Sequence, residues 1–167
     1  MADLIFAEIE LLSGDSKPAT WREQFAQFLE RTTRTLIAHP AMATLMPAFN
    51  SWSYHAFNVM EEALSILRGA GFTPLEASQI MEHTFYSLVS LVKAEPDIVP
   101  QSQPKGLSKT GRRMRLQLEA LPPDKYPHVI EAARTLTTAV DSASYYQFGL
   151  DLLLAGIEGM AHRSREQ

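Results

Sequence analysis

Residues 145–160 read YYQFGLDLLLAGIEGM, and wound as an α-helix this stretch is apolar around most of its circumference. Its strongly polar residues are Gln147, Asp151 and Glu158, which fall on one narrow line at about 100° per residue. A helix packed on a single domain usually shows an apolar stripe of roughly 100° or a little more. We therefore expect this helix to contact its own core on one side and another body on the other.

Two glycines of this stretch, Gly149 and Gly156, lie opposite the polar line. Glycine in a helix interior costs about 1 kcal/mol relative to alanine. Two glycines on one face therefore indicate the close approach of another helix, or room for a ligand. A central helix of one large bundle would show the same pattern, and this alternative stays open.

Length and composition favour one globular domain and exclude several classes of protein. The chain has 167 residues, of which 46% are hydrophobic, enough for one core and too few to require two. It has no cysteine, which excludes disulfides, thiolate nucleophiles and cysteine-ligated metals, and fits a cytoplasmic location. A net charge of −4 argues against a chain whose main task is to hold nucleic acid. The start, MADLIFAEIELLSGD, is too short and too acidic for a signal peptide or a membrane span.

Helix signals dominate the chain, and strand signals are nearly absent. Thr20 with Glu23 and Thr73 with Glu76 form capping boxes, while Asn50 or Ser51, and Asp141 or Ser142, are further N-cap candidates. The sequence therefore predicts an all-α fold, an antiparallel multi-helix bundle. The predicted helices span residues 2–12, 20–38, 40–48, 51–68, 74–94, 109–121, 128–140 and 142–162, with a long connection over 95–108.

Residues that could carry out catalysis do not converge in the sequence. The five histidines are scattered, and none has the partner three or four residues away that would place two metal ligands on one helix face. The chain has no nucleophile elbow, phosphate-cradling glycine loop or dinucleotide fingerprint. We predict no catalytic residues, no metal and no cofactor. An enzyme is the third hypothesis, to be tested at Tyr86 or His83.

Two threonines, Thr32 and Thr84, interrupt otherwise apolar helix faces. A buried threonine hydroxyl usually bonds the carbonyl three or four residues earlier, which would make both residues structural. The functional alternative is a small-molecule pocket, which is mostly apolar and aromatic with a few polar groups that orient the ligand. The candidate pocket residues are Phe25, Phe28, Leu29, Thr32, Trp52, Met60, Met81, Thr84, Phe85 and Phe148.

A polar stripe on the helix predicted over 74–94 has two interpretations. It contains Glu82, His83, Tyr86, Ser90 and Lys93. Most such stripes are solvated. The alternative is the rim of a subunit interface, in which Tyr86 would be an aromatic anchor.

In their order, these segments resemble the C-terminal half of TetR-family bacterial transcriptional regulators. The similarity covers nearly the whole chain. It is strongest at the helix that opens with Trp21-Arg22-Glu23 and ends at His39-Pro40, at residues 69–77 (GAGFTPLEA), and at residues 121–127 (LPPDKYP) leading to residues 146–154 (YQFGLDLLL). The resemblance implies an all-α domain that binds a small apolar or amphipathic effector and forms a homodimer. It places the pocket among the helices at 20–38, 51–68 and 74–94.

The resemblance also implies that the helices at 74–94 and 142–162 pair with their copies in a four-helix interface. We assign the arc of the last helix that contains Leu150, Leu153, Leu154 and Ile157 to the second subunit. The arc of Phe148, Leu152 and Ala155 is assigned to the domain's own core and pocket. The candidate interface residues are His83, Tyr86, Ser90, Tyr146, Leu150, Leu153, Leu154 and Ile157.

The helix-turn-helix domain that precedes this region in the family is not seen before Trp21, so we expect no direct contact of this chain with nucleic acid, and none with a membrane. Residues 1–12 then resemble the end of a connecting helix, and residues 13–167 the ligand-binding and dimerisation domain. The favoured hypothesis is an effector-binding and dimerisation domain of a TetR-like regulator. The alternative is a stand-alone helical dimer or interaction module without a physiological ligand.

Overall fold

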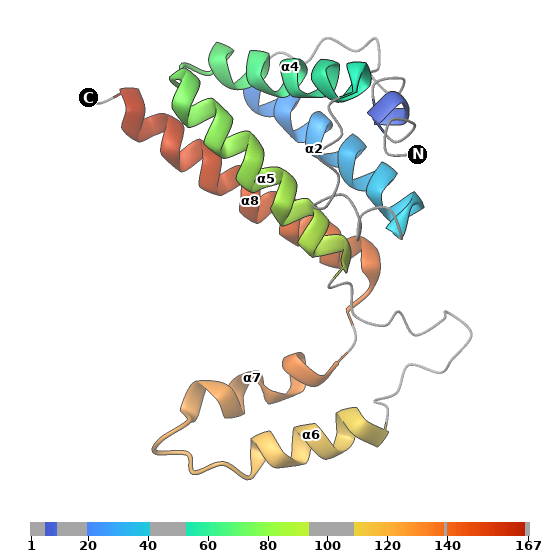
Figure 1. Cartoon of the computed structure of the whole chain (residues 1–167). Helices are drawn as coiled ribbons and strands as arrows, with labels where there is room; N and C mark the ends of the chain where they lie inside the picture. Colours follow the sequence, from blue (N-terminus) through green and yellow to red (C-terminus); the bar gives the residue numbers. More distant parts are fainter. Residues whose placement is uncertain (1–5, 10–19, 41–52, 94–108, 139, 166–167) are drawn as a thin grey trace. The chain divides into compact units, whose positions relative to one another are not determined.

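The computed structural model describes residues 6–9, 20–40, 53–93, 109–138 and 140–165, and within these ranges the regular secondary structure is entirely α-helical. Residues 6–9 form one helical segment (Figure 1). The longer helices are α2 (Trp21–Ala38), α4 (Tyr54–Gly69), α5 (Pro74–Lys93), α6 (Lys109–Glu119), α7 (Pro127–Thr137) and α8 (Ser142–Arg165). The predicted all-α fold is confirmed. Several predictions concern residues that lie wholly or almost wholly outside the described ranges. They are the helices over residues 2–5, 10–12 and 40–48, the pocket residue Trp52, the 95–108 connection and the boundary after residue 12.

Both predicted capping boxes are present. The Thr20 hydroxyl accepts from the Glu23 backbone N–H at 3.2 Å, and the Glu23 carboxylate accepts from the Thr20 N–H at 3.0 Å. Thr73 and Glu76 make the same reciprocal pair at 3.3 and 2.8 Å. Each box satisfies N–H groups that the first turn of a helix leaves without an intrahelical partner.

The predicted cap of α4 was wrong by two or three residues. The N-cap is Ser53, whose hydroxyl accepts from the Ala56 N–H at 3.2 Å, in place of the expected Asn50 or Ser51. Serine and asparagine cap helices about equally well, so residue type alone could not choose among three neighbouring candidates.

The helices divide into two compact units. One contains residues Met1–Ala94 and Tyr146–Gln167, and therefore α2, α4, α5 and most of α8; the other is Glu95–Tyr145, with α6 and α7. The core of the first unit is built from large side chains that are almost fully enclosed, namely Ile9, Phe25, Leu29, Leu36, Leu67, Phe72 and Leu88.

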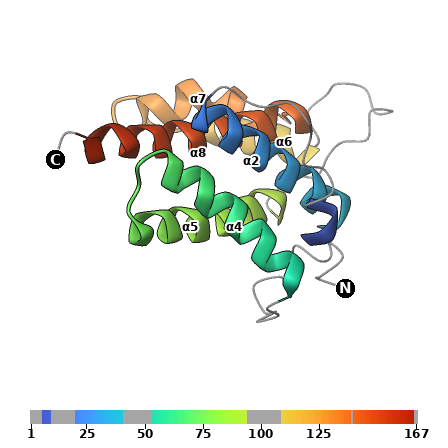
Figure 2. The ribbon, with the colours of Figure 1, turned by 90° about the horizontal axis from the view of Figure 1, so that it is seen from above.

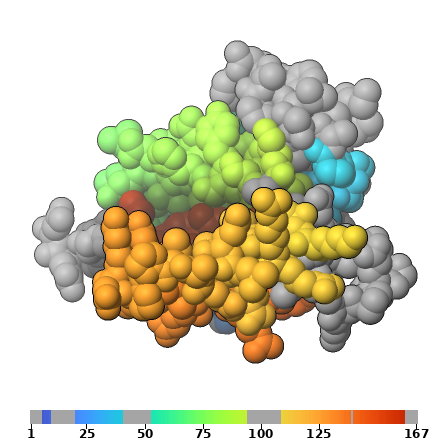
Figure 3. Space-filling model, turned by 90° about the horizontal axis from the view of Figure 1, so that it is seen from below, coloured from blue at the N-terminus to red at the C-terminus, as the bar shows by residue number. Residues whose placement is uncertain are grey.

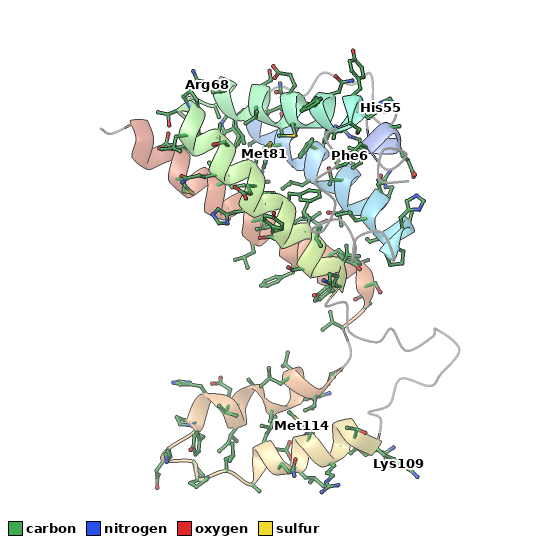
Figure 4. The ribbon with its side chains drawn as sticks, viewed as in Figure 1. Phe6, His55, Arg68, Met81, Lys109 and Met114 are labelled. Carbon is green, nitrogen blue, oxygen red and sulfur yellow. The ribbon has the colours of Figure 1, made fainter. Side chains whose placement is uncertain are left out.

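The turn from α4 into α5 brings Phe72 into this core. Gly71 has a φ of 100°, a conformation that glycine adopts without steric cost. Arg68, at the end of α4, donates to the Phe72 carbonyl (Figure 4). The Phe72 ring then meets Trp21 of α2 edge to face, with centroids 6.3 Å apart. The end of α4 and the start of α2 are thereby held together.

A close approach at Gly149 marks where α8 meets α5. A Cβ at this position would lie 2.8 Å from both methyl groups of Leu91 on α5. Figure 1 shows α5 and α8 running in opposite directions. The arc with Tyr146, Leu150 and Ile157, next to this contact on the helix, is buried.

The second unit is a hairpin of two short helices. Side chains of α6 and α7 meet along its length, as Figure 3 shows in yellow and orange. Ala133 is buried there, whereas Met114, Leu116 and Leu136 are exposed. Asp141 then caps α8 by accepting from the Ser144 N–H at 3.0 Å, and its hydrogen bonds with Ser144 hold the pKa of the Asp141 carboxyl below its ordinary value.

Candidate functional site

Eight of the ten predicted pocket residues lie on α2, α4 and α5, and α2 contacts both of the other helices. Seen from above in Figure 2, α4 lies across α5 with α2 beside them. The rings of Phe25 and Phe28 are stacked, with centroids 5.7 Å apart. Of the ten candidates, Phe25, Phe28, Leu29, Thr32 and Thr84 are buried, and Met60, Met81 and Phe85 are half-buried.

Phe148 does not belong to this group. Its side chain is 71% exposed on α8, so the prediction that it lines the pocket was wrong. The error follows from the phase of α8, because the helix buries the arc of Tyr146, Leu150 and Ile157 and Phe148 lies on the other side. Trp52 lies outside the described residues.

Thr32 takes the structural role that a buried helical threonine usually has. Its hydroxyl donates to the Phe28 carbonyl at 2.8 Å, one turn earlier. This bond satisfies the hydroxyl without a ligand. Thr84 is buried on the inward face of α5, as its position among apolar residues predicted.

The sequence reasoning missed Arg31, the most unusual residue of α2. Its side chain is only 10% exposed, and its guanidinium forms an ion pair with Glu62 of α4. The Cζ atom lies 5.6 Å from the centre of the Phe28 ring. The available signal was its place on the helix, since Arg31 falls between Phe28 and Thr35 on a face that is otherwise buried.

Three buried polar atoms of α2 have no hydrogen-bond partner in the described part of the chain. They are Nε of Arg31 and the hydroxyl oxygens of Thr33 and Thr35. A buried polar group without a partner costs about 1–3 kcal/mol, and a native structure holds few of them. We call Arg31, Thr35 and Glu62 the polar seam. Its unused groups are donors, so it can bind an oxygen atom of a ligand.

The predicted interface residues divide between the surface and the core. His83, Tyr86 and Ser90 are exposed on α5, as the interface prediction requires. On α8, Tyr146, Leu150, Leu154 and Ile157 are each no more than 8% exposed within this chain, and Leu153 is half-buried. The chain's own core leaves Tyr146, Leu150, Leu154 and Ile157 little surface for a second subunit, whereas the assignment of Leu153 to the interface stays a prediction.

The opposite arc of α8 carries the exposed apolar residues. Phe148 and Leu152 are 71% and 65% exposed, and Gly156 has open space where a Cβ would stand. On α5, Leu75 and Tyr86 are also exposed. We call Leu75, Tyr86, Phe148, Leu152 and Met160 the outward patch.

No group of three or more histidine, aspartate or glutamate residues is placed to hold a metal ion within the described ranges. None of the described helices is long and apolar enough to cross a membrane. The polar seam, the aromatic side chains of α2 and the outward patch are therefore the features on which a functional assignment has to be built.

Comparison with known proteins places the chain in a family. Residues 14–161 match the tetracyclin repressor-like C-terminal domain. The chain belongs to this family. The match runs from the segment before α2 through most of α8, so it covers the polar seam and the outward patch of this TetR-like domain. A search of curated protein sequences gave no significant match.

Solved structures of TetR-family regulators share the fold. ActR of Streptomyces coelicolor in complex with actinorhodin has a TM-score of 0.76 at 19% identity, covering 95% of this chain and 73% of that one. The apo form of ActR has a TM-score of 0.72 at 21% identity, covering 95% and 72%. The regulator SCO7222, a TetR from the same organism, has a TM-score of 0.65 at 15% identity, covering 95% and 73%. At these identities the likeness concerns the fold.

Proposed function

We propose that this TetR-like domain binds a small organic effector and forms a homodimer, as the sensing and assembly part of a transcriptional regulator. The observation that carries the proposal is the family match over residues 14–161. No enzymatic activity is part of the proposal, and we expect the protein to act in the cytoplasm.

The effector site is proposed around α2, α4 and α5. Stacked Phe25 and Phe28 supply an aromatic wall, and half-buried Met60, Met81 and Phe85 supply side chains that can adjust to a ligand. The similar ActR fold was solved in complex with actinorhodin and with (S)-DNPA. These complexes support an organic molecule of apolar or amphipathic character as the effector class here.

The homodimer is proposed to form through α5 and α8. The outward patch exposes five large apolar side chains, and a second copy would remove them from water. Gly156 faces open space in the same arc as Leu152, so a partner helix can approach closely there. The interface therefore uses Tyr86 of α5 as predicted, but Phe148 and Leu152 of α8 instead of Leu150 and Ile157.

Effector binding would shift the population of conformations that the dimer adopts. A ligand moves such an equilibrium only by its difference in affinity for the two states. The seam joins α2 to α4, α2 also contacts α5, and α5 meets α8 through Leu91 and Gly149. A change at the seam can thus reach the outward patch through packed helices.

The test is a thermal-shift screen of the full chain against a broad library of aromatic and amphipathic compounds. A ligand at a hundredfold excess over its Kd stabilises a protein by about 2.7 kcal/mol, which for a chain of this size raises the Tm by about 5–10 °C. We expect at least one compound class to give such a shift. A library without any effect, on a protein that is dimeric in solution, would favour the interaction module over the effector domain.

A further inference from the structure

Two unused donors of α2 lie on one face, one helical turn apart. Nε of Arg31 and the hydroxyl of Thr35 are buried and have no hydrogen-bond partner among the described residues. Side chains four residues apart on a helix are neighbours, with Cβ atoms about 5–6 Å apart. A single oxygen-bearing group can therefore reach both donors.

The Arg31 guanidinium is only partly used by its counter-ion. One oxygen of Glu62 accepts from Nη2, while Nε stays unbonded. The Nε–H and the neighbouring terminal N–H form a planar pair that matches the two oxygens of a carboxylate. Glu62 thus occupies one half of a two-pronged site for an acid.

Glu62 is the member of the pair that can leave. Its side chain is 34% exposed, against 10% for Arg31, so Glu62 can return to water whereas the arginine cannot. A buried guanidinium requires an anionic partner, and only another acid can replace Glu62 without leaving the charge uncompensated. Beside the guanidinium lies the Phe28 ring, stacked on Phe25, which offers an apolar surface to the rest of a ligand.

We propose that the effector is a small aromatic carboxylic acid whose carboxylate takes the place of Glu62 on Arg31. The acid accepts from Nε and Nη2 of Arg31 and from the Thr35 hydroxyl, and its ring system lies against the wall of Phe28. Binding opens the ion pair between α2 and α4. This inference rests on the proposed effector function, and it adds the chemical class of the ligand and the contact that the ligand breaks.

The experiment compares carboxylic acids with their methyl esters by titration calorimetry on the full chain. The pairs are 2-naphthoic acid and 9-anthracenecarboxylic acid, each with its methyl ester, and further acids of one to four fused rings with theirs. We expect the best acid to bind about tenfold to a hundredfold more tightly than its ester, because the ester cannot form charge-assisted bonds. Equal affinities within every pair would overturn the inference and leave the proposed function standing. Binding of neither member of any pair would also overturn the inference, whereas the proposed function is overturned only by failure of the broad library screen.

Variants of the polar seam test whether Arg31 causes the preference for acids over esters. Arg31→Met should abolish the difference between acid and ester, because the group that distinguishes a carboxylate is gone. The matched control is Arg34→Met, an exposed arginine of the same helix, which should leave the acid's affinity as it was. A lost preference in both variants would indicate a general effect of charge and overturn the assignment to Arg31.

Two further variants keep the test decisive if Arg31→Met does not fold. Glu62→Gln removes the competing carboxylate, so it should raise the affinity for the acid several-fold and increase the ratio of acid to ester affinity. Thr35→Val removes one donor and keeps the side-chain shape, so it should reduce the preference for the acid. A weaker acid complex in Glu62→Gln, or an unchanged preference in Thr35→Val, would overturn the proposed binding mode.

Discussion

The polar seam and the outward patch depart from ordinary burial in opposite directions. The seam encloses an arginine and a threonine with unused donors inside the fold, whereas the patch leaves Phe148 71% and Leu152 65% exposed. Each arrangement costs free energy in the isolated chain, the first through unmet hydrogen bonds and the second through hydrated apolar surface.

The difference teaches what kind of partner would relieve each region. A ligand with acceptor oxygens would satisfy the seam, and an apolar surface would cover the patch. The two regions lie on different helices, the seam on α2 and α4 and the patch on α5 and α8, so a substitution in one leaves the side chains of the other in place. The predictions below use this separation.

Leu152→Glu should give the largest effect and should act on assembly alone. A charge in the centre of an apolar interface loses its hydration without gaining a partner, so dimerisation should weaken by at least about a hundredfold. Sedimentation velocity at tens of micromolar measures the change, and circular dichroism should show unaltered helicity.

The chain offers a close control for this variant. Leu116 of α6 is 67% exposed, against 65% for Leu152, but lies in the other compact unit. Leu116→Glu should leave the dimer intact. If both variants dissociate equally, the interface is not confined to α5 and α8; if Leu152→Glu remains dimeric, the outward patch is not the interface.

Breaking the seam from its two ends should give unequal changes in stability. Glu62→Leu leaves the Arg31 charge buried without a counter-ion and should lower the free energy of unfolding by about 1–3 kcal/mol, a range that allows for the partial exposure of Glu62. Arg31→Met leaves Glu62 as the unpaired charge, and because Glu62 is 34% exposed it can be hydrated, so the loss of stability should be smaller. Urea denaturation measures both. Equal losses would show that Arg31 contributes through packing, which would contradict the view of the seam as an underused site.

The helix boundaries near these two regions could be predicted from the sequence, but the orientation of α8 could not. Capping boxes at Thr20 and Thr73 and the glycines after α4 are local signals, and the helices at these places are as expected. A helical wheel also separates the faces of α8 correctly, because the angle between two residues depends on spacing alone. It cannot say which face turns inward. That depends on packing against distant residues, such as the contact of Gly149 with Leu91, 58 positions away (149 − 91). The arc of Phe148 and Leu152, predicted to face the core, is exposed.

The polar seam was missed for a related reason. Arg31 and Glu62 each look like solvated residues on their own helices, since charged side chains are rarely buried without a partner. Their pairing depends on how α2 packs on α4, and no local pattern encodes it. The candidate site could therefore be predicted in its apolar part, Phe25 with Phe28, but not in the groups that would give it chemical selectivity.

Gly156→Ala should raise the stability of the subunit and weaken the dimer. Alanine is favoured over glycine in a helix interior by about 1 kcal/mol, and the added methyl group meets nothing within 4 Å in this chain. In the proposed interface the same methyl group would hold the partner helix away. Urea denaturation and sedimentation together detect these opposite changes. A more stable subunit with unchanged dimerisation would place Gly156 outside the interface. Gly149→Ala is the control, because its added methyl group must displace Leu91 within the subunit.

Thr35→Val should give the smallest effect, and its sign is informative. The valine methyl replaces a buried hydroxyl that has no partner among the described residues, so the free energy of unfolding should rise by up to about 1 kcal/mol. Thr32→Val is the matched control one turn away, because that hydroxyl does bond the Phe28 carbonyl and its removal should not stabilise the fold. Chemical denaturation of the two variants in parallel measures the difference. If the free energy of unfolding rises in Thr35→Val but not in Thr32→Val, the unliganded fold tolerates a hydroxyl without a hydrogen-bond partner at the seam, as expected of a residue that binds a ligand. If it falls in Thr35→Val, the Thr35 hydroxyl already has a partner.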